Sequence, residues 1–169
     1  DSTVWSWGNN GDGQLGNGTT ILKSNIPVQV GSLTGITALA GGWYHSLALK
    51  NDSTVWAWGR NVYGQLGNGT SVASNIPVQV SGLTGITALV SGDFHALALK
   101  NDGTVWAWGR NSNGQLGNGT TTASNVPVQI TGLTGVAVLA SGADHSLALK
   151  SDGTVWAWGY NGLGQLGNG

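Results

Sequence analysis

The sequence predicts an all-β protein made of β-propeller blades, each with four antiparallel strands. A W-x-W-G motif returns about every fifty residues, beginning at Trp5, Trp56, Trp106 and Trp156. Short runs of β-forming residues fill each copy, and none shows the period of an amphipathic helix. Four strands in a repeat of this length are typical of a propeller blade. Because such repeats bury their apolar surface against one another, functional residues are expected where the copies differ.

The chain is expected to be one repeat domain, residues 1–169. The copies occupy residues 1–51, 52–101 and 102–151, followed by a partial copy at 152–169. We expect each copy to fold as one blade. The first copy has one extra residue between Asn17 and Pro27, which predicts a surface loop that tolerates insertion.

The second copy shows the expected strands in order. Residues 54–58 (Thr-Val-Trp-Ala-Trp) place both indoles on one face, where they can fill the space between blades. Residues 77–80 begin with a proline, which indicates the start of a strand or a sheet edge. Residues 86–90 and 95–99 are two further apolar strands. The Asn-Asp-Gly within residues 100–104 predicts a tight hairpin turn.

The repeating pattern is G-x-x-H-S/A-L-A-L-K-x-D-G/S-T-V-W-A/S-W-G-x-N-x-x-G-Q-L-G-N-G. It resembles the regulator-of-chromosome-condensation repeat, and the resemblance covers the whole chain. The resemblance implies a β-propeller, typically with seven blades, and we expect a bacterial secreted or surface member. The family includes an exchange factor for a small nuclear GTPase, a plant ultraviolet-B photoreceptor and a secreted β-lactamase inhibitor. Three copies are fewer than that ring needs, so we expect a fragment of a longer propeller or a ring completed by oligomerisation.

Composition excludes several classes of protein. Only 8% of residues are charged and the net charge is −1, which argues against a nucleic-acid surface. No apolar run is long enough for a membrane span. Cysteine is absent, so disulfides and thiol chemistry are excluded. The neutral polar surface favours an extracellular or cell-surface location.

No catalytic, metal or cofactor site is expected. The chain has no Glu to pair with an Asp, and the G-Q-L-G-N-G motif lacks the Lys-Ser/Thr ending of a phosphate loop. His45, His95 and His145 recur with the repeat, but Asp93 and Asp144 stand at different offsets, unlike a fixed ligand set. We expect each histidine to form a hydrogen bond within its own blade.

The Asn-x-Ser/Thr sequons at Asn17, Asn51, Asn68 and Asn118 leave glycosylation open. In three of them the Asn-Gly pair is explained equally well by turn conformation.

The residues that differ between copies fall in predicted loops, where aromatic and charged side chains on a rigid scaffold are typical of a binding surface. The alternative is drift at unconstrained positions. We expect residues 43–44, 93–94 and 143–144 to line one end of the ring. The candidate partner-binding residues are Asp12, Trp43, Tyr44, Arg60, Val62, Tyr63, Asp93, Phe94, Arg110, Asp144 and Tyr160.

These observations favour a non-catalytic scaffold for protein–protein interaction, whose partner is another protein or a second copy. The alternative is a self-assembling array or oligomeric propeller, of which a six-bladed dimer is the smallest closed form. In it, the strand at residues 3–7 or 27–30 completes the unfinished blade that begins near Val136. An inhibitor or exchange-factor role is disfavoured because no copy has an insertion longer than one residue. Photoreception is disfavoured because Trp43 has no adjacent Arg in the sequence.

Overall fold

The computed structural model describes residues 2–31 and 33–169, and these form thirteen β-strands and no helix. No element of the described ranges is therefore a helix that could cross a membrane. The all-β prediction is confirmed. The strands are β1 (Trp5–Asn9), β2 (Lys23–Gln29), β3 (Ile36–Gly41), β4 (His45–Lys50), β5 (Val55–Gly59), β6 (Ser74–Gln79), β7 (Ile86–Ser91), β8 (His95–Lys100), β9 (Val105–Gly109), β10 (Ser124–Gln129), β11 (Val136–Ser141), β12 (His145–Lys150) and β13 (Val155–Gly159).

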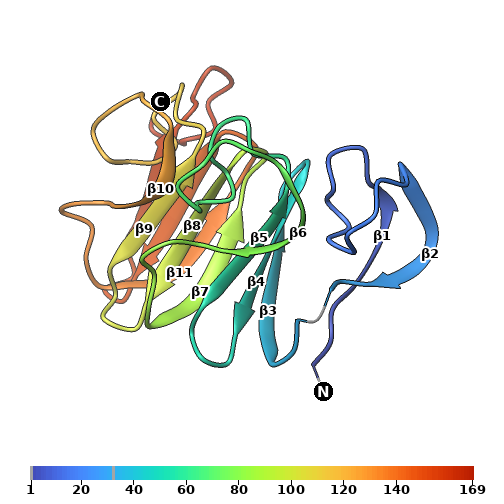
Figure 1. Ribbon diagram of the computed structural model, residues 1–169. Coiled ribbons are helices and arrows are strands. Elements are labelled where there is room, and N and C mark those ends of the chain that lie inside the picture. Colours follow the sequence, from blue (N-terminus) through green and yellow to red (C-terminus); the bar gives the residue numbers. More distant parts are fainter. Residues whose placement is uncertain (1, 32) are drawn as a thin grey trace.

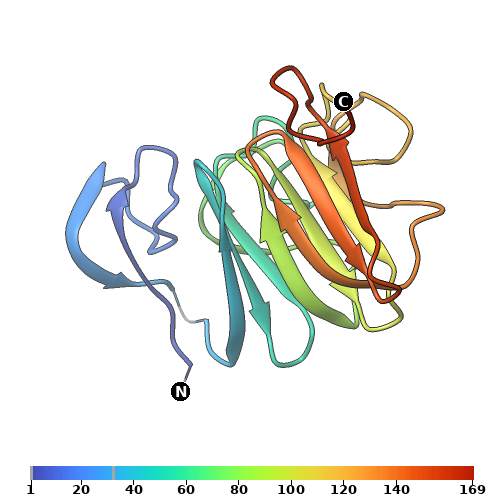
Figure 2. The same ribbon diagram turned by 180° about the vertical axis from the view of Figure 1, so that it is seen from behind.

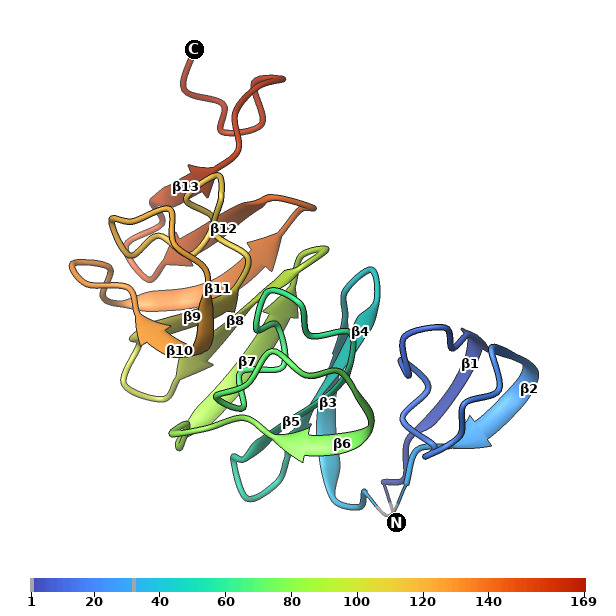
Figure 3. The ribbon, with the colours of Figure 1, turned by 45° about the horizontal axis from the view of Figure 1, so that its top comes forward.

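The strands form four antiparallel sheets in which sequence neighbours pair. Strands β3–β6 make the first full blade and β7–β10 the second. Strands β11–β13 make a three-stranded third blade, and β1 pairs with β2 alone. The sheets follow one another in chain order along an open arc (Figures 1 and 3). The β1–β2 hairpin lies at one end of that arc and β11–β13 at the other, as the reverse view in Figure 2 also shows.

The four-stranded blades are confirmed, but the expectation that each sequence copy folds as one blade is wrong. The first full blade takes β3 and β4 from the first copy and β5 and β6 from the second. The reason is the tight turn between the copies: Lys50 donates its backbone N–H to Thr54 O at 2.9 Å and thereby closes the β4–β5 hairpin. The sequence boundary therefore falls in the middle of a sheet.

The core lies between the blades. Leu47 and Leu49 of the first full blade pack with Ala96, Ala98 and Trp108 of the second. The same arrangement follows one blade later, where Leu97 and Leu99 pack with Ala148 and Trp158. Because side chains alternate along a strand, β4, β8 and β12 each carry two leucines on one face and small residues, Ala or Ser, on the other. Small residues on one face let the next sheet approach closely.

The G-Q-L-G-N-G turn of each blade is tied to the second tryptophan of the next. The indole Nε1 of Trp108 donates to Gln65 O at 3.0 Å, and Trp58 and Trp158 make the same bond to residues 14 and 115. Gly67 has a φ of +62°, and a Cβ there would lie 2.9 Å from the Trp108 ring. The motif is a turn, as expected, and its glycine leaves room for the neighbouring indole.

Proline stands inside the outermost strand of both full blades. Pro77 lies in β6 and Pro127 in β10, and each of these strands is the edge of its sheet. The missing N–H of proline is tolerated at an edge because one side of the strand has no partner.

Candidate functional site

The variable loops gather along the upper side of the blades in Figure 1, where β3, β5, β7 and β9 end. The antiparallel pairing of His45 with Gly59 brings the β3–β4 turn beside the loop that follows β5. Arg60 fixes this contact by donating its backbone N–H to Tyr44 O at 2.9 Å. The same geometry recurs at residues 94 and 110 and at residues 144 and 160.

Asn61 organises the loop after β5. It is fully buried, its Oδ1 accepts from the Leu66 N–H at 2.9 Å, and its Nδ2 donates to Val72 O at 3.0 Å. Gln65 Oε1 accepts from the Tyr63 N–H at 2.9 Å, which presents the Tyr63 side chain outward. This explains why Asn and Gln recur in every copy while the residues between them vary.

Four aromatic side chains from two blades meet here, and we call Trp43, Tyr44, Tyr63 and Phe94 the aromatic cluster. Trp43 stacks on Tyr44 with ring centroids 5.4 Å apart and lies 5.9 Å from Phe94. Tyr63 meets Phe94 edge-on at 5.5 Å. Trp43 remains 62% exposed and Tyr63 40% exposed. Exposed aromatic rings held in a fixed arrangement are a common anchor of protein interfaces.

Two arginines cover the rings. The Arg60 guanidinium lies 5.3 Å from the Tyr44 centroid, and the Arg110 guanidinium lies 5.6 Å from Tyr63 and 6.0 Å from Phe94. At these distances a guanidinium is attracted to the face of the ring. The cluster therefore combines apolar area with positive charge.

Arg110 has polar partners of its own. Its Nη1 lies 3.5 Å from the Asp144 carboxylate, and its Nε donates to Ser112 Oγ at 3.0 Å. Gln115 Nε2 also donates to Asp144, at 2.8 Å. Between the second and third blades, a carboxylate thus receives hydrogen bonds from both an arginine and a glutamine.

Asp93 lies in the β7–β8 turn, on the same side of the blades. Burial raises the pKa of its carboxyl above the ordinary value, the negative charge of Asp144 raises it further, and Arg110 lowers it. Its backbone O accepts from the Trp43 N–H at 3.2 Å and its N–H donates to Ala143 O at 3.0 Å, so Asp93 links the turn of the first full blade to that of the third.

The structure brings most of the sequence-predicted candidates together, although contact with a partner is untested. Seven of them make ring or ion-pair contacts with one another: Trp43, Tyr44, Arg60, Tyr63, Phe94, Arg110 and Asp144. Val62 is an exposed neighbour of Tyr63 in the same loop. Asp12 instead lines a hollow between the loop after β1 and β6, and Tyr160 lies in the loop after β13.

Sequence reasoning missed Gln65 and Gln115. Both are fully buried, and both lie in the shared turn motif that the sequence interprets only as structure. The sequence alone could have indicated their role only through a comparison of the residues that face each Gln from the next blade.

The expectation that each histidine bonds within its own blade is wrong. His45 Nε2 lies 3.1 Å from Ser91 Oγ of the second full blade, and His95 Nε2 lies 3.0 Å from Ser146 Oγ of the third. Burial lowers the pKa of His45 to about 3 and that of His95 to about 4, with a smaller contribution from the next histidine along the arc. Both rings are therefore neutral, and each connects two neighbouring blades through a hydrogen bond. Within residues 2–31 and 33–169, no three His, Cys, Asp or Glu side chains are grouped to hold a metal ion.

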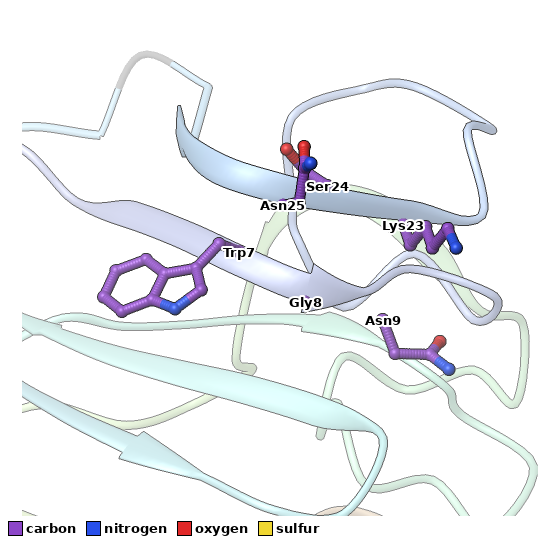
Figure 4. A pocket seen from close by; sticks show the side chains of 6 residues that line it. All are labelled: Trp7, Gly8, Asn9, Lys23, Ser24 and Asn25. Carbon is purple, nitrogen blue, oxygen red and sulfur yellow. The ribbon is translucent and has the colours of Figure 1, made fainter.

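A hollow of about 560 Å³ lies against the β1–β2 hairpin (Figure 4). It is lined by residues 7–9 and 23–25, whose side chains point in different directions rather than toward one centre. Lys23 is the one charged side chain of that lining. This hollow offers no convergent set of polar groups for chemistry.

Comparison with known proteins gives the same fold. The structure is similar to human WBSCR16, with 27% identity and a TM-score of 0.83 over 94% of this chain and 43% of that one. It is also similar to Prp20p from Saccharomyces cerevisiae, a structure reported with its binding properties to Gsp1p and histones. There the identity is 24% and the TM-score 0.82, over 99% of this chain and 43% of that one.

Curated relatives match over a shorter stretch. Human alsin is 46% identical over 67 residues, which cover 38% of this chain and 4% of alsin. The human probable E3 ubiquitin-protein ligase HERC6 is 44% identical over 68 residues, covering 39% of this chain and 7% of HERC6. The chain thus spans a small part of these relatives. The model of the RCC1-like domain, in contrast, matches residues 1–169, and the chain belongs to that β-propeller family.

Proposed function

We propose that this chain is a non-catalytic interaction module that binds a partner protein through the aromatic cluster. The observation that carries the proposal is the exposed Trp43 ring, which is stacked on Tyr44 and contacts Phe94 of the next blade. An indole with 62% of its surface exposed gains little from these contacts alone. Covering it with a partner would remove a large apolar area from water.

The position of the cluster supports the same function. Its rings come from loops of two blades, and those blades are held rigid by the core between them. The corresponding residues of the third blade are Ala143 and Asp144, so the cluster does not follow from the repeat. Loops on a rigid scaffold are the usual place for such a surface. An extracellular or cell-surface location remains part of this proposal, supported by the sparsely charged, cysteine-free composition.

Site-specific photo-crosslinking tests the proposal. A photoreactive phenylalanine analogue replaces Tyr63 in one variant and Val72 in another; both residues are exposed in the loop after β5. In the cells that make the protein, we expect a discrete protein adduct from position 63 and none from position 72. Equal adducts from both positions, or none from position 63, would contradict the proposed face.

The second candidate function is self-assembly, which a separate observation favours. Strand β1 pairs with β2 only, whereas the equivalent strands β5 and β9 pair on both edges. Trp5 and Trp7 of β1 and Trp156 of β13 are 51%, 64% and 54% exposed. As it stands, the 169-residue chain therefore presents apolar rings and free strand edges, and both promote association with other chains.

A further inference from the structure

The first and second full blades differ at one end in a way that points to a ligand. Arg110 and Gln115 follow β9, and both donate to the carboxylate of Asp144 in the next blade. Arg60 and Gln65 follow β5 at the equivalent positions, but in the next blade Phe94 stands where Asp144 would be expected. The first full blade thus keeps the two donors while its neighbour lacks the acceptor.

The side chains show the consequence of this change. Among the residues that the structure describes, Arg60 makes no ion pair, and its buried Nε has no hydrogen-bond partner. The Nε of Arg110 donates to Ser112, but Val62 stands at the equivalent position beside Arg60. Gln65 is 0% exposed, and its Nε2 also has no partner. Buried donors without acceptors are rare in folded proteins, because each loses its hydrogen bonds to water without gaining another.

The nearby charges make one side of this surface positive and the other negative. Asp144 pairs with Arg110, and the backbone of Asp93 is hydrogen-bonded to Trp43 and to Ala143, the neighbour of Asp144. The guanidinium of Arg60 is partly exposed and unneutralised, with the Tyr44 ring beneath it. An incoming negative charge is therefore favoured over Arg60 and disfavoured over the Asp93 side.

We propose that the aromatic cluster binds a protein segment that places an Asp or Glu carboxylate on Arg60 and an apolar side chain against Trp43 and Tyr63. The carboxylate pairs with the exposed part of the Arg60 guanidinium, as Asp144 pairs with Arg110 from within the chain. A guanidinium can donate two parallel hydrogen bonds to a carboxylate, a geometry that lysine does not reproduce. The proposal rests on the proposed function and adds the chemistry of the partner.

The first step of the test identifies a ligand with a defined probe. Random heptapeptides displayed on phage are selected on the immobilised 169-residue chain. We expect enriched sequences to contain Asp or Glu beside an aromatic or large aliphatic residue. Enrichment of sequences without an acidic residue, lost in Trp43→Ala, would overturn this inference but leave the proposed function standing. The absence of any enriched peptide would count against both.

The second step measures whether the acid contacts Arg60. The enriched peptide and its amide analogue, with Asn for Asp or Gln for Glu, are titrated calorimetrically against three proteins. We expect the amide to bind the wild type at least tenfold more weakly and Arg60→Gln to lose the distinction between the two peptides. Lys100→Gln is the control. It also removes one positive charge, but from the Lys100–Asp102 pair, which lies at the end of the second full blade opposite to the aromatic cluster. If both peptides bind the wild type equally, the inference is overturned.

The third step replaces the missing acceptor and does not depend on changing Arg60. Phe94→Asp places a carboxylate where Asp144 stands in the next blade, and Phe94→Asn places a side chain of the same size without the charge. We expect the acidic peptide to keep its advantage over the amide with Phe94→Asn and to lose it with Phe94→Asp. Thermal unfolding of each variant confirms that it is folded. Equal discrimination by both variants would overturn the proposal.

Discussion

At the residue scale, the copies use shared polar side chains to connect blades and variable ones to form a surface. His45 and His95 are buried and neutral, and each reaches a serine of the next blade. Their Nδ1 atoms are buried without a hydrogen-bond partner. A charged imidazolium is disfavoured at such a site because water cannot reach it.

Acid should therefore lower the free energy of unfolding at pH values well above those at which carboxylates titrate. The unfolded chain takes up protons at these histidines below pH 6.5, whereas the folded chain does so only near pH 4 and pH 3. Their contribution is complete above pH 6.5 and falls with decreasing pH by about 1.4 kcal/mol per pH unit for each histidine. Asp93, whose pKa is raised, contributes with the opposite sign.

Urea unfolding at several pH values between 7 and 4.5 checks this, with His45→Gln as the comparison. We expect the variant to show about half the wild-type pH dependence, because one of the two titrating rings remains. A free energy of unfolding that does not change over this pH range would contradict the interpretation that the buried histidines are neutral.

A second residue-scale prediction concerns two glycines in the same left-handed conformation. Gly67 and Gly82 have φ values of +62° and +70°, but only at Gly67 would a Cβ meet the Trp108 ring. Gly82→Ala should cost only the backbone strain, about 1–2 kcal/mol. Gly67→Ala should cost about 1–3 kcal/mol more, because it overfills the contact between blades. Equal losses in chemical denaturation would show that the approach of the indole is not limiting.

At the element scale, the strands follow from alternation and turn chemistry, whereas the extent of a blade does not. Residues 86–90 and 95–99 were predicted as strands and form the greater part of β7 and β8. Strands pair across the copy boundary at the β4–β5 hairpin, and a repeat has no preferred starting point in sequence. The exposed loops of the candidate site were predictable because the copies differ there. The role of Gln115 was not predictable because its side-chain partner, Asp144, belongs to another blade.

The tryptophan pairs give a prediction at this scale. Trp108 of β9 is fully buried between blades and donates to Gln65 O, whereas Trp156 of β13 is 54% exposed. Trp108→Ala should cost about 3–5 kcal/mol, and Trp156→Ala much less. Denaturant midpoints at constant m-value measure both changes. Similar losses in the two variants would mean that the rings of the open end are covered in solution.

At the scale of the whole molecule, the chain resembles a strip of propeller with complementary ends. Strand β12 pairs with β13 through Leu149 opposite Val155 and His145 opposite Gly159. In β1 and the residue before it, Val4 and Gly8 stand at the positions of Val155 and Gly159, as the repeat of residues 1–18 at 152–169 requires. The β1–β2 hairpin of a second copy can therefore compete with β13 for the same edge of β12. In that exchange it also supplies the fourth strand that the third blade lacks.

Light scattering on the 169-residue chain tests this exchange. We expect a concentration-dependent increase toward twice the chain mass, because two copies that share strands in this way form six complete blades: two from each chain and two shared. A chain of residues 1–151 lacks the competing β13 and leaves the edge of β12 open, so it should dimerise at lower concentration. Replacing Trp5 and Trp7 by Ser in that shorter chain should weaken the association, since both rings are largely exposed in the single chain. If both lengths remain monomeric at high concentration, the blades are not completed by a second copy, and the self-assembly function is excluded for this chain.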